Sequence, residues 1–227
     1  MTTEASPQRT ELPVSGREEI IKILQDTGSP PSLIEHVSTV CERSLRIADR
    51  VGAAGIAVDR RMLEAGALLH DMGAPMCKGA PIVIPEWGDR AKGLLSDFLM
   101  HPIHGFHLAG TYGFPMTVRR CILCHTPGPT REECRALGMT PPDEELLPVN
   151  IEEKIIMYAD FVTWAAMLGL NPWQNPNVMA EAGVPYFNYY WRAAQLTPLT
   201  LDGPVAQRWI YAQQEMGRYA EPAWFGL

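Results

Sequence analysis

The feature that most constrains the fold of this chain is the apolar segment from Asp59 to Gly73, which contains a histidine followed directly by an aspartate. Its apolar residues recur at the spacing of one helix face. Asp59 is suited to cap the start of a helix, and Gly73 is suited to stop it. The segment therefore predicts a buried helix over 59–71 that delivers His70 and Asp71 at its carboxyl end. These ligand types suit first-row metals, although an isolated pair is also typical of a hydrogen-bonded helix end.

Two other segments with helical periodicity each carry a candidate ligand. An amphipathic helix is predicted over 32–53, with Ser32 as its cap and His36 in its first turn. A second is predicted over 151–169, where Asp160 lies among core-like residues. A carboxylate in such a place loses hydration unless a positive group meets it. A metal ion would supply that positive partner.

The order of these residues along the chain resembles the HD superfamily of metal-dependent phosphohydrolases. The local sequences at 68–73 and 153–160 look like the signature turn and the last ligand helix of that family. The segments 101–105 and 124–128 are similar to the two extra histidine motifs of the subgroup that binds two metals. That subgroup includes HD-GYP phosphodiesterases and a bacterial family of diadenosine tetraphosphate hydrolases. The resemblance runs from His36 to Asp160.

The resemblance implies hydrolysis of a phosphate ester or anhydride in a small molecule, with a nucleotide as the expected substrate. It implies two divalent transition-metal ions, with iron, manganese, cobalt, nickel and zinc all compatible with the ligands. A hydroxide bridging the ions would be the attacking group, and Asp71 the catalytic residue. Residue by residue, one ion would be held by His36, His70, Asp71 and Asp160, and a second by Asp71, His101 and His125.

The predicted contacts to a small anionic substrate are His104, Lys78 and Arg131. Many HD hydrolases carry a lysine just after the His-Asp turn, where this chain has Ala74. Lys78 or an arginine could replace its charge, although each such side chain is also compatible with an ordinary surface role. The arginines considered are Arg119, Arg120 and Arg131, and His107 is expected to be structural.

Two alternatives to hydrolysis remain open from the sequence. The absence of that lysine is compatible with an HD-type mixed-valence di-iron oxygenase acting on a small organic substrate. Oxygenases of this kind that act on organophosphonates carry a tyrosine before the first histidine. Here all seven tyrosines lie at Tyr112 or later, which disfavours that subtype. A non-catalytic nucleotide sensor is the third hypothesis, and the complete ligand set argues against it.

The pattern Cys121-x-x-Cys124-His125 also matches the attachment motif of haem c. Attachment requires export, and residues 1–7 lack the basic start and apolar run of a secretory signal. We therefore expect both cysteines on the packed helix that presents His125. A zinc site would need two further ligands. Five cysteines without an export signal predict reduced thiols and a cytoplasmic protein.

The whole chain is predicted to be all-α, an HD-domain helical bundle with a C-terminal helical, aromatic-rich extension. The expected organisation is a mobile tail over 1–16, the metal-binding domain over 17–170 and the extension over 171–227. No strand is expected, and long loops are expected over 74–88 and 126–150. The predicted helices are 17–27, 32–53, 59–71, 89–100, 101–112, 115–126 and 151–169.

The composition of the chain argues against two classes of binding partner. A net charge of -7 disfavours a nucleic-acid polymer as partner. No apolar stretch approaches the roughly 20 residues that cross a bilayer, so no membrane partner is expected. Most aromatic residues lie from Phe161 onward, including the cluster at 186–191. They are expected to pack on the core, to form a homodimer surface or to stack a base.

Overall fold

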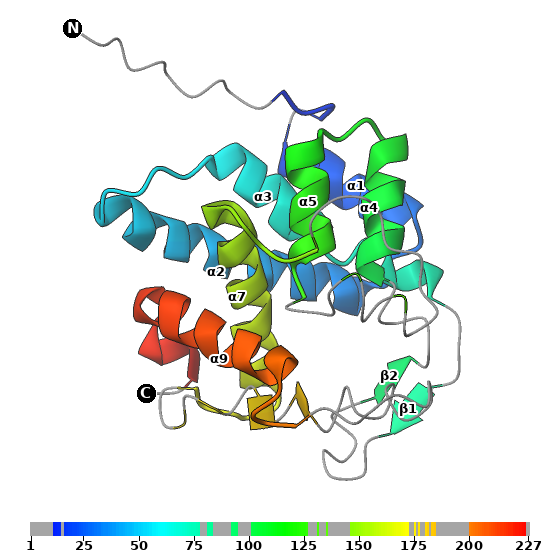
Figure 1. The fold of residues 1–227 in the computed structure, drawn as a ribbon. Helices are drawn as coiled ribbons and strands as arrows, with labels where there is room; N and C mark the ends of the chain where they lie inside the picture. The colour runs from blue at the N-terminus through cyan, green and yellow to red at the C-terminus, as the bar shows by residue number, and fades with distance from the viewer. Residues whose placement is uncertain are drawn as a thin grey trace, which may run out of the picture.

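The computed structural model describes residues 11–14, 16–77, 81–83, 92–94, 101–126, 131, 135, 146–172, 175, 177, 180–181, 183–184 and 200–225. The described part is a bundle of helices, shown in Figure 1. Its elements in chain order are α1 (Arg17–Asp26), α2 (Pro31–Ala53), α3 (Arg60–Leu69), η1 (Ala74–Met76), β1 (Pro81–Val83), β2 (Lys92–Leu94), α4 (His101–Thr111), α5 (Met116–Cys124), α7 (Ile151–Met167), α9 (Pro204–Met216), η4 (Gly217–Tyr219) and η5 (Pro222–Phe225).

The predicted all-α architecture is confirmed. The six predicted helices that correspond to α1, α2, α3, α4, α5 and α7 have ends within two residues of those observed. Amphipathic periodicity is clearest in α2, whose buried residues recur every three or four positions along one stripe. The segments 1–10 and 186–191 lie outside the described residues, and so do most of the two predicted loops.

Two predictions about secondary structure were wrong. Lys92–Leu94, inside the predicted helix 89–100, is a strand that pairs antiparallel with Pro81–Val83. Strand pairing is a long-range contact, so the helical spacing within 89–100 could not reveal it. The rest of 89–100 lies outside the described residues. The predicted cap of α2 was also misplaced, because Pro30 is the N-cap and Pro31 opens the helix, which puts His36 in the second turn.

The core lies where α2, α3, α5 and α7 meet, and α2 packs against both α3 and α7. Figure 1 shows α7 crossing α2, with α9 beside the C-terminal part of α7. Close packing of α3 on α5 depends on Gly66, where a Cβ would lie 2.6 Å from the Cβ of Cys121. The two helices that will present His70 and His125 are therefore held at short range.

The C-terminal segment shares the core of the preceding helices. Met216, Tyr219 and Ala220 belong to the same buried cluster as α2, α3 and α7. A second cluster joins Trp209 of α9 to Phe161 and Ala165 of α7. The predicted helical character of the extension is found in α9, while the boundary at 170/171 stays a prediction.

A buried ion pair fixes the start of α7. Asn150 and Glu153 form a reciprocal capping box, and both carboxylate oxygens of Glu153 also accept from Arg120 of α5, at 2.7 and 2.9 Å. The neighbouring Glu152 accepts from the backbone N–H of Asp59, at 2.7 Å, where α3 begins. The start of α7 is therefore tied to the helices that carry His70 and His125.

Within the described residues, no helix is both long and apolar enough to cross a lipid bilayer.

Candidate metal centre

The turn after α3 places His70 and Asp71 inside the bundle. Asp59 caps α3 by accepting from the backbone N–H groups of Arg61 and Met62, at 3.1 and 3.0 Å, as the sequence predicted. The helix ends at Leu69, and the chain then turns through Asp71. The adjacent side chains of His70 and Asp71 can therefore face one point, which a continuing helix would not allow.

Asp71 divides its carboxylate between two pairs of histidines. Its Oδ2 lies 3.5 Å from the Nε2 atom of His36 and 3.5 Å from that of His70. Its Oδ1 lies 3.0 Å from the Nε2 atom of His101 and 3.4 Å from that of His125. One carboxylate therefore connects two separate groups of imidazole nitrogens.

Asp160 joins the first of these groups. Its Oδ1 lies 3.1 Å from Nε2 of His36 and 3.6 Å from Nε2 of His70. His36 comes from α2 and Asp160 from α7, so the site lies where these two helices cross. Pairing with these histidines offsets the loss of hydration that the sequence analysis predicted for the Asp160 carboxylate.

The second group forms at one end of a helical hairpin. A tight turn at Gly113, whose φ is +78°, reverses the chain between α4 and α5. The start of α4 and the end of α5 then lie together, because the two helices run antiparallel. His101 begins α4 and His125 follows α5, and their Nε2 atoms are 2.9 Å apart.

Backbone carbonyls orient two of the rings for metal binding. Nδ1 of His70 donates to the carbonyl of Ala67 at 2.7 Å, and Nδ1 of His125 donates to that of Ile122 at 2.6 Å. A carbonyl can only accept, so Nδ1 carries the proton in each neutral ring and Nε2 carries the lone pair. Nε2 of His70 is buried and has no hydrogen-bond partner among the described residues. A metal ion would satisfy that atom.

The electrostatics of the cluster favour the anionic form of both carboxylates and the charged form of His70. Burial opposes charge on His70, but the nearby carboxylates of Asp71 and Asp160 outweigh it and raise its pKa well above the usual value. Burial also opposes charge on the two carboxyls, but the nearby histidines hold both pKa values below their usual range. At His125 burial prevails and lowers the pKa. A divalent cation bound here would replace shared protons as the counter-charge.

The predicted ligands therefore come together in space. Ligand atoms of His36, His70 and Asp160 all lie within 4.8 Å of one another, and so do those of His70, Asp71 and His125. Neutral imidazoles and carboxylates form a donor set that suits first-row divalent metals. The arrangement fits the metal sites expected from the sequence, while the role of each ligand remains a prediction.

The other residues predicted from the sequence at this site have different degrees of exposure. His104 is half-buried one turn beyond His101 on α4, and His107 is exposed with its ring against Phe106. Arg131 is half-buried, and Lys78 lies outside the described residues. Their substrate contacts stay predictions.

Two of the arginines considered as replacements for the missing lysine have structural partners. Arg119 stacks on the ring of Phe106, 4.0 Å from its centroid, and donates to the carbonyl of the same residue. Arg120 forms an ion pair with Glu153 at the start of α7. A capping-box signature of asparagine followed three residues later by glutamate could have identified that network from the sequence.

Gly73 allows the His-Asp turn to touch α4. A Cβ at this position would overlap the backbone oxygen of His101 and the backbone nitrogen of Gly105. Its φ is -82°, so the requirement is space rather than a left-handed backbone. The sequence predicted that Gly73 stops the helix, but α3 already ends at Leu69.

We expect Gly73→Ala to push α4 away from the turn and to weaken the site around His101. The extra methyl should cost about 1–3 kcal/mol of stability, as overpacking usually does. Bound metal per chain, measured by plasma mass spectrometry, should fall more than in Gly52→Ala, whose new Cβ would have no neighbour within 4 Å. Equal metal content in the two variants would contradict this role.

Cys121 and Cys124 are buried on α5, the helix that presents His125, as the sequence predicted. Burial raises the pKa of the Cys121 thiol well above its usual value. The sulfur of Cys124 accepts from Arg120 at 3.6 Å. Neither belongs to a group of potential metal ligands in the described part of the chain.

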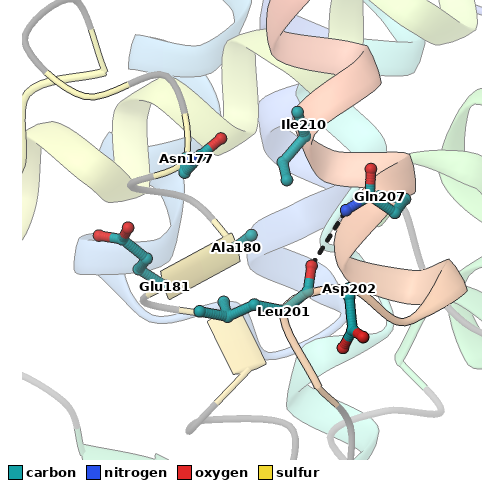
Figure 2. A pocket seen from close by; sticks show the side chains of 7 residues that line it. All are labelled: Asn177, Ala180, Glu181, Leu201, Asp202, Gln207 and Ile210. Atoms are coloured by element: carbon teal, nitrogen blue, oxygen red, sulfur yellow. Dashed lines mark hydrogen bonds between the residues drawn. The ribbon is translucent and has the colours of Figure 1, made fainter.

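A pocket of about 370 Å³ lies between α9 and the segment that contains Asn177, Ala180 and Glu181. Figure 2 shows the side chains that line it and the hydrogen bond from Gln207 to the carbonyl of Leu201. None of its lining residues belongs to the predicted site. The lining residues are Asn177, Ala180, Glu181, Leu201, Asp202, Gln207 and Ile210.

Comparison with family models finds a match to the HD domain over residues 33–165. A tRNA (cytidine(56)-2'-O)-methyltransferase from Picrophilus torridus is 30% identical over 148 residues, which are 65% of this chain and 36% of that protein. An uncharacterised protein from Methanocaldococcus jannaschii is 28% identical over 144 residues, which are 63% of this chain and 72% of that protein. The chain thus spans about a third of the length of the first relative.

Among solved structures, the HD domain of the L. monocytogenes phosphodiesterase PgpH is similar, with a TM-score of 0.47 and 16% identity. The match covers 89% of this chain and all of that one. The same domain in complex with cyclic-di-AMP gives a TM-score of 0.46 and 16% identity, and covers 90% of this chain and 98% of that one.

Proposed function

This chain belongs to the HD family, and on that premise we propose that it is a metal-dependent phosphohydrolase with a two-metal centre. Its substrate would be a phosphate ester or anhydride of a small molecule, such as a nucleotide. His36, His70, Asp71 and Asp160 would hold one ion. His101 and His125 would hold the second, with Asp71 shared between the two.

The observation that carries this proposal is the divided carboxylate of Asp71. Its two oxygens face different pairs of histidines, at 3.5 and 3.5 Å on one side and at 3.0 and 3.4 Å on the other. A carboxylate that served only as a hydrogen-bond partner of His70 would not need His101 and His125 at its other oxygen. The arrangement supports a bridge between two cations.

Two divalent cations, when bound, would supply Lewis acidity that activates water and stabilises charge on a phosphoryl group. The residues of the chain prepare the site for that chemistry. The carbonyls of Ala67 and Ile122 keep the lone pairs of His70 and His125 directed at the centre. Pre-oriented ligands reduce the reorganisation that metal binding requires.

One edge of the centre is partly exposed to solvent. The side chains of His70, His101 and His125 are 0%, 3% and 1% exposed. Those of Asp71 and Asp160 are 13% and 22% exposed, and that of His36 is 18% exposed. The solvent-accessible edge therefore lies where α2 meets α7, and we infer that substrate approaches there.

Metal counting tests whether there are two sites. We expect about two metal ions per chain in the wild type and about one in His101→Ala or His125→Ala, because each histidine contributes to the second site only. Asp160→Ala should instead weaken the first site. Plasma mass spectrometry on variants with unchanged circular dichroism measures these contents.

About one ion per wild-type chain, with unchanged content in both histidine variants, would contradict the two-metal arrangement. The reaction itself is tested by screening the metal-loaded wild type for phosphate release from nucleotides and other phosphate esters. Absence of any hydrolysis, together with bound iron and oxygen uptake, would identify an oxygenase instead.

A further inference from the structure

Arg43 lies on α2 where this helix contacts α7, on the side of the partly exposed edge of the centre. It follows His36 by seven residues on α2, which is almost two full turns, so the two residues lie on the same helix face. Thr163 follows Asp160 by three residues on α7, a neighbouring position on that surface. Nη1 of Arg43 donates to the hydroxyl of Thr163 at 3.0 Å.

The guanidinium of Arg43 is held by neutral groups. Thr163 donates its own hydroxyl hydrogen to the carbonyl of Ala159 at 2.7 Å, so its oxygen lone pairs are available to Arg43. The ring of Trp224 lies under the guanidinium, 5.3 Å from its centroid to the central carbon. These contacts orient the planar group without neutralising its charge.

Two other arginines of α2 form ion pairs with the carboxylate of Glu221. Glu221 pairs with Arg46 at 3.2 Å and with Arg50 at 3.3 Å. In the described part of the chain, no carboxylate forms an ion pair with Arg43, and the charged neighbour that acts on it is Arg46. Burial first, and then the charge of Arg46, lower the pKa of Arg43. A half-buried cation without counter-charge is costly and favours an anionic ligand.

The distance between Arg43 and the histidine cluster limits which ligands could contact both. Seven residues of helix separate the Cα atoms of His36 and Arg43 by about 10 Å, and three residues separate those of Asp160 and Thr163 by about 5 Å. A phosphoryl group at the histidine cluster would therefore lie about one nucleotide unit from the guanidinium. A single phosphate is too small to reach both.

We propose that Arg43 binds a second anionic group of the substrate, so that the substrate is a phosphate ester carrying another phosphate about one nucleotide unit from the reacting phosphorus. This inference rests on the proposed function, because it assumes that the first phosphoryl group binds at the metal centre. Many HD hydrolases carry a lysine just after the His-Asp turn, where this chain has Ala74. Arg43 would supply a positive charge to the substrate from a different place.

Ligand binding to the manganese-loaded protein tests this role. The probes are thymidine 5′-monophosphate and thymidine 3′,5′-bisphosphate, measured by isothermal titration calorimetry. We expect the wild type to bind the bisphosphate about tenfold more tightly, the value of one charge-assisted hydrogen-bonded contact. Arg43→Gln should remove that preference and keep the affinity for the monophosphate. Gln retains a donor for Thr163, which limits structural damage.

The matched control is Arg46→Gln, because Arg46 lies on the same helix, is 59% exposed and leaves Glu221 paired with Arg50. It should retain the preference, and Arg43→Lys should retain part of it. Metal content and thermal unfolding are measured for every variant. A wild type without preference, or an Arg43→Gln variant with unchanged preference, would overturn the inference. Equal weakening of both ligands would assign Arg43 a structural role.

Failure of the proposed function has a different signature. A protein that prefers the bisphosphate through Arg43 but hydrolyses no phosphate ester in the screen would keep this inference and lose the phosphohydrolase proposal. A protein that hydrolyses phosphate esters with no effect of Arg43→Gln on bisphosphate preference would do the reverse.

Discussion

Replacing Asp71 with alanine is expected to lower the rate of phosphate-ester hydrolysis by about 10³-fold or more. Its two oxygens face both histidine groups, so the variant loses a ligand from each proposed metal site at once. Metal-ion catalysis supplies several kcal/mol of charge stabilisation, and each 1.36 kcal/mol corresponds to a factor of ten in rate. The measurement is kcat/KM on the best ester from the screen, with metal in excess.

Asp49→Ala is the matched control, because Asp49 lies on α2 with a side chain 65% exposed, paired with Arg60. It should leave both the rate and the metal content close to those of the wild type. An Asp71→Ala variant that folds normally and keeps the wild-type rate would show that the histidine cluster is not the catalytic site.

Replacing Glu153 with alanine is expected to lower the free energy of unfolding by about 3–5 kcal/mol. The variant leaves Arg120 without its buried partner, and breaking such a pair usually costs that amount. It also removes an acceptor from the backbone N–H of Val149 and breaks the capping box of α7. Urea unfolding followed by circular dichroism measures the change.

Glu215→Gln provides the comparison, because it breaks the more exposed ion pair between Glu215 of α9 and Lys154 of α7. That change should cost less than about 1 kcal/mol. Glu153→Gln should lie between the two, since glutamine can still complete a capping box but carries no charge. An equal cost for Glu153→Ala and Glu215→Gln would contradict a structural role for the Arg120 pair.

Three of the candidate ligands could be proposed from their places in helical patterns, and the others came from the resemblance to the HD superfamily. His70 and Asp71 follow an apolar helix, and Asp160 interrupts an apolar face where a lone carboxylate would be costly. These signals are local. The strand at Lys92–Leu94 was missed because its pairing with Pro81–Val83 is not local. The cap at Ser32 was misplaced because a pair of prolines begins the helix earlier.

The sequence alone determined the helical architecture, because periodicity is a property of the chain itself. The set of candidate metal ligands came from the resemblance of its motifs to the HD superfamily. Tertiary structure decided how those residues are shared. Only packing turns one oxygen of Asp71 toward α2 and the other toward the hairpin of α4 and α5, with Gly73 permitting the contact. Packing also assigned Arg120 to Glu153 and left Arg43 on the α2 and α7 seam beside neutral partners. Charge balance at a buried side chain depends on its neighbours in space, which spacing along the chain does not specify.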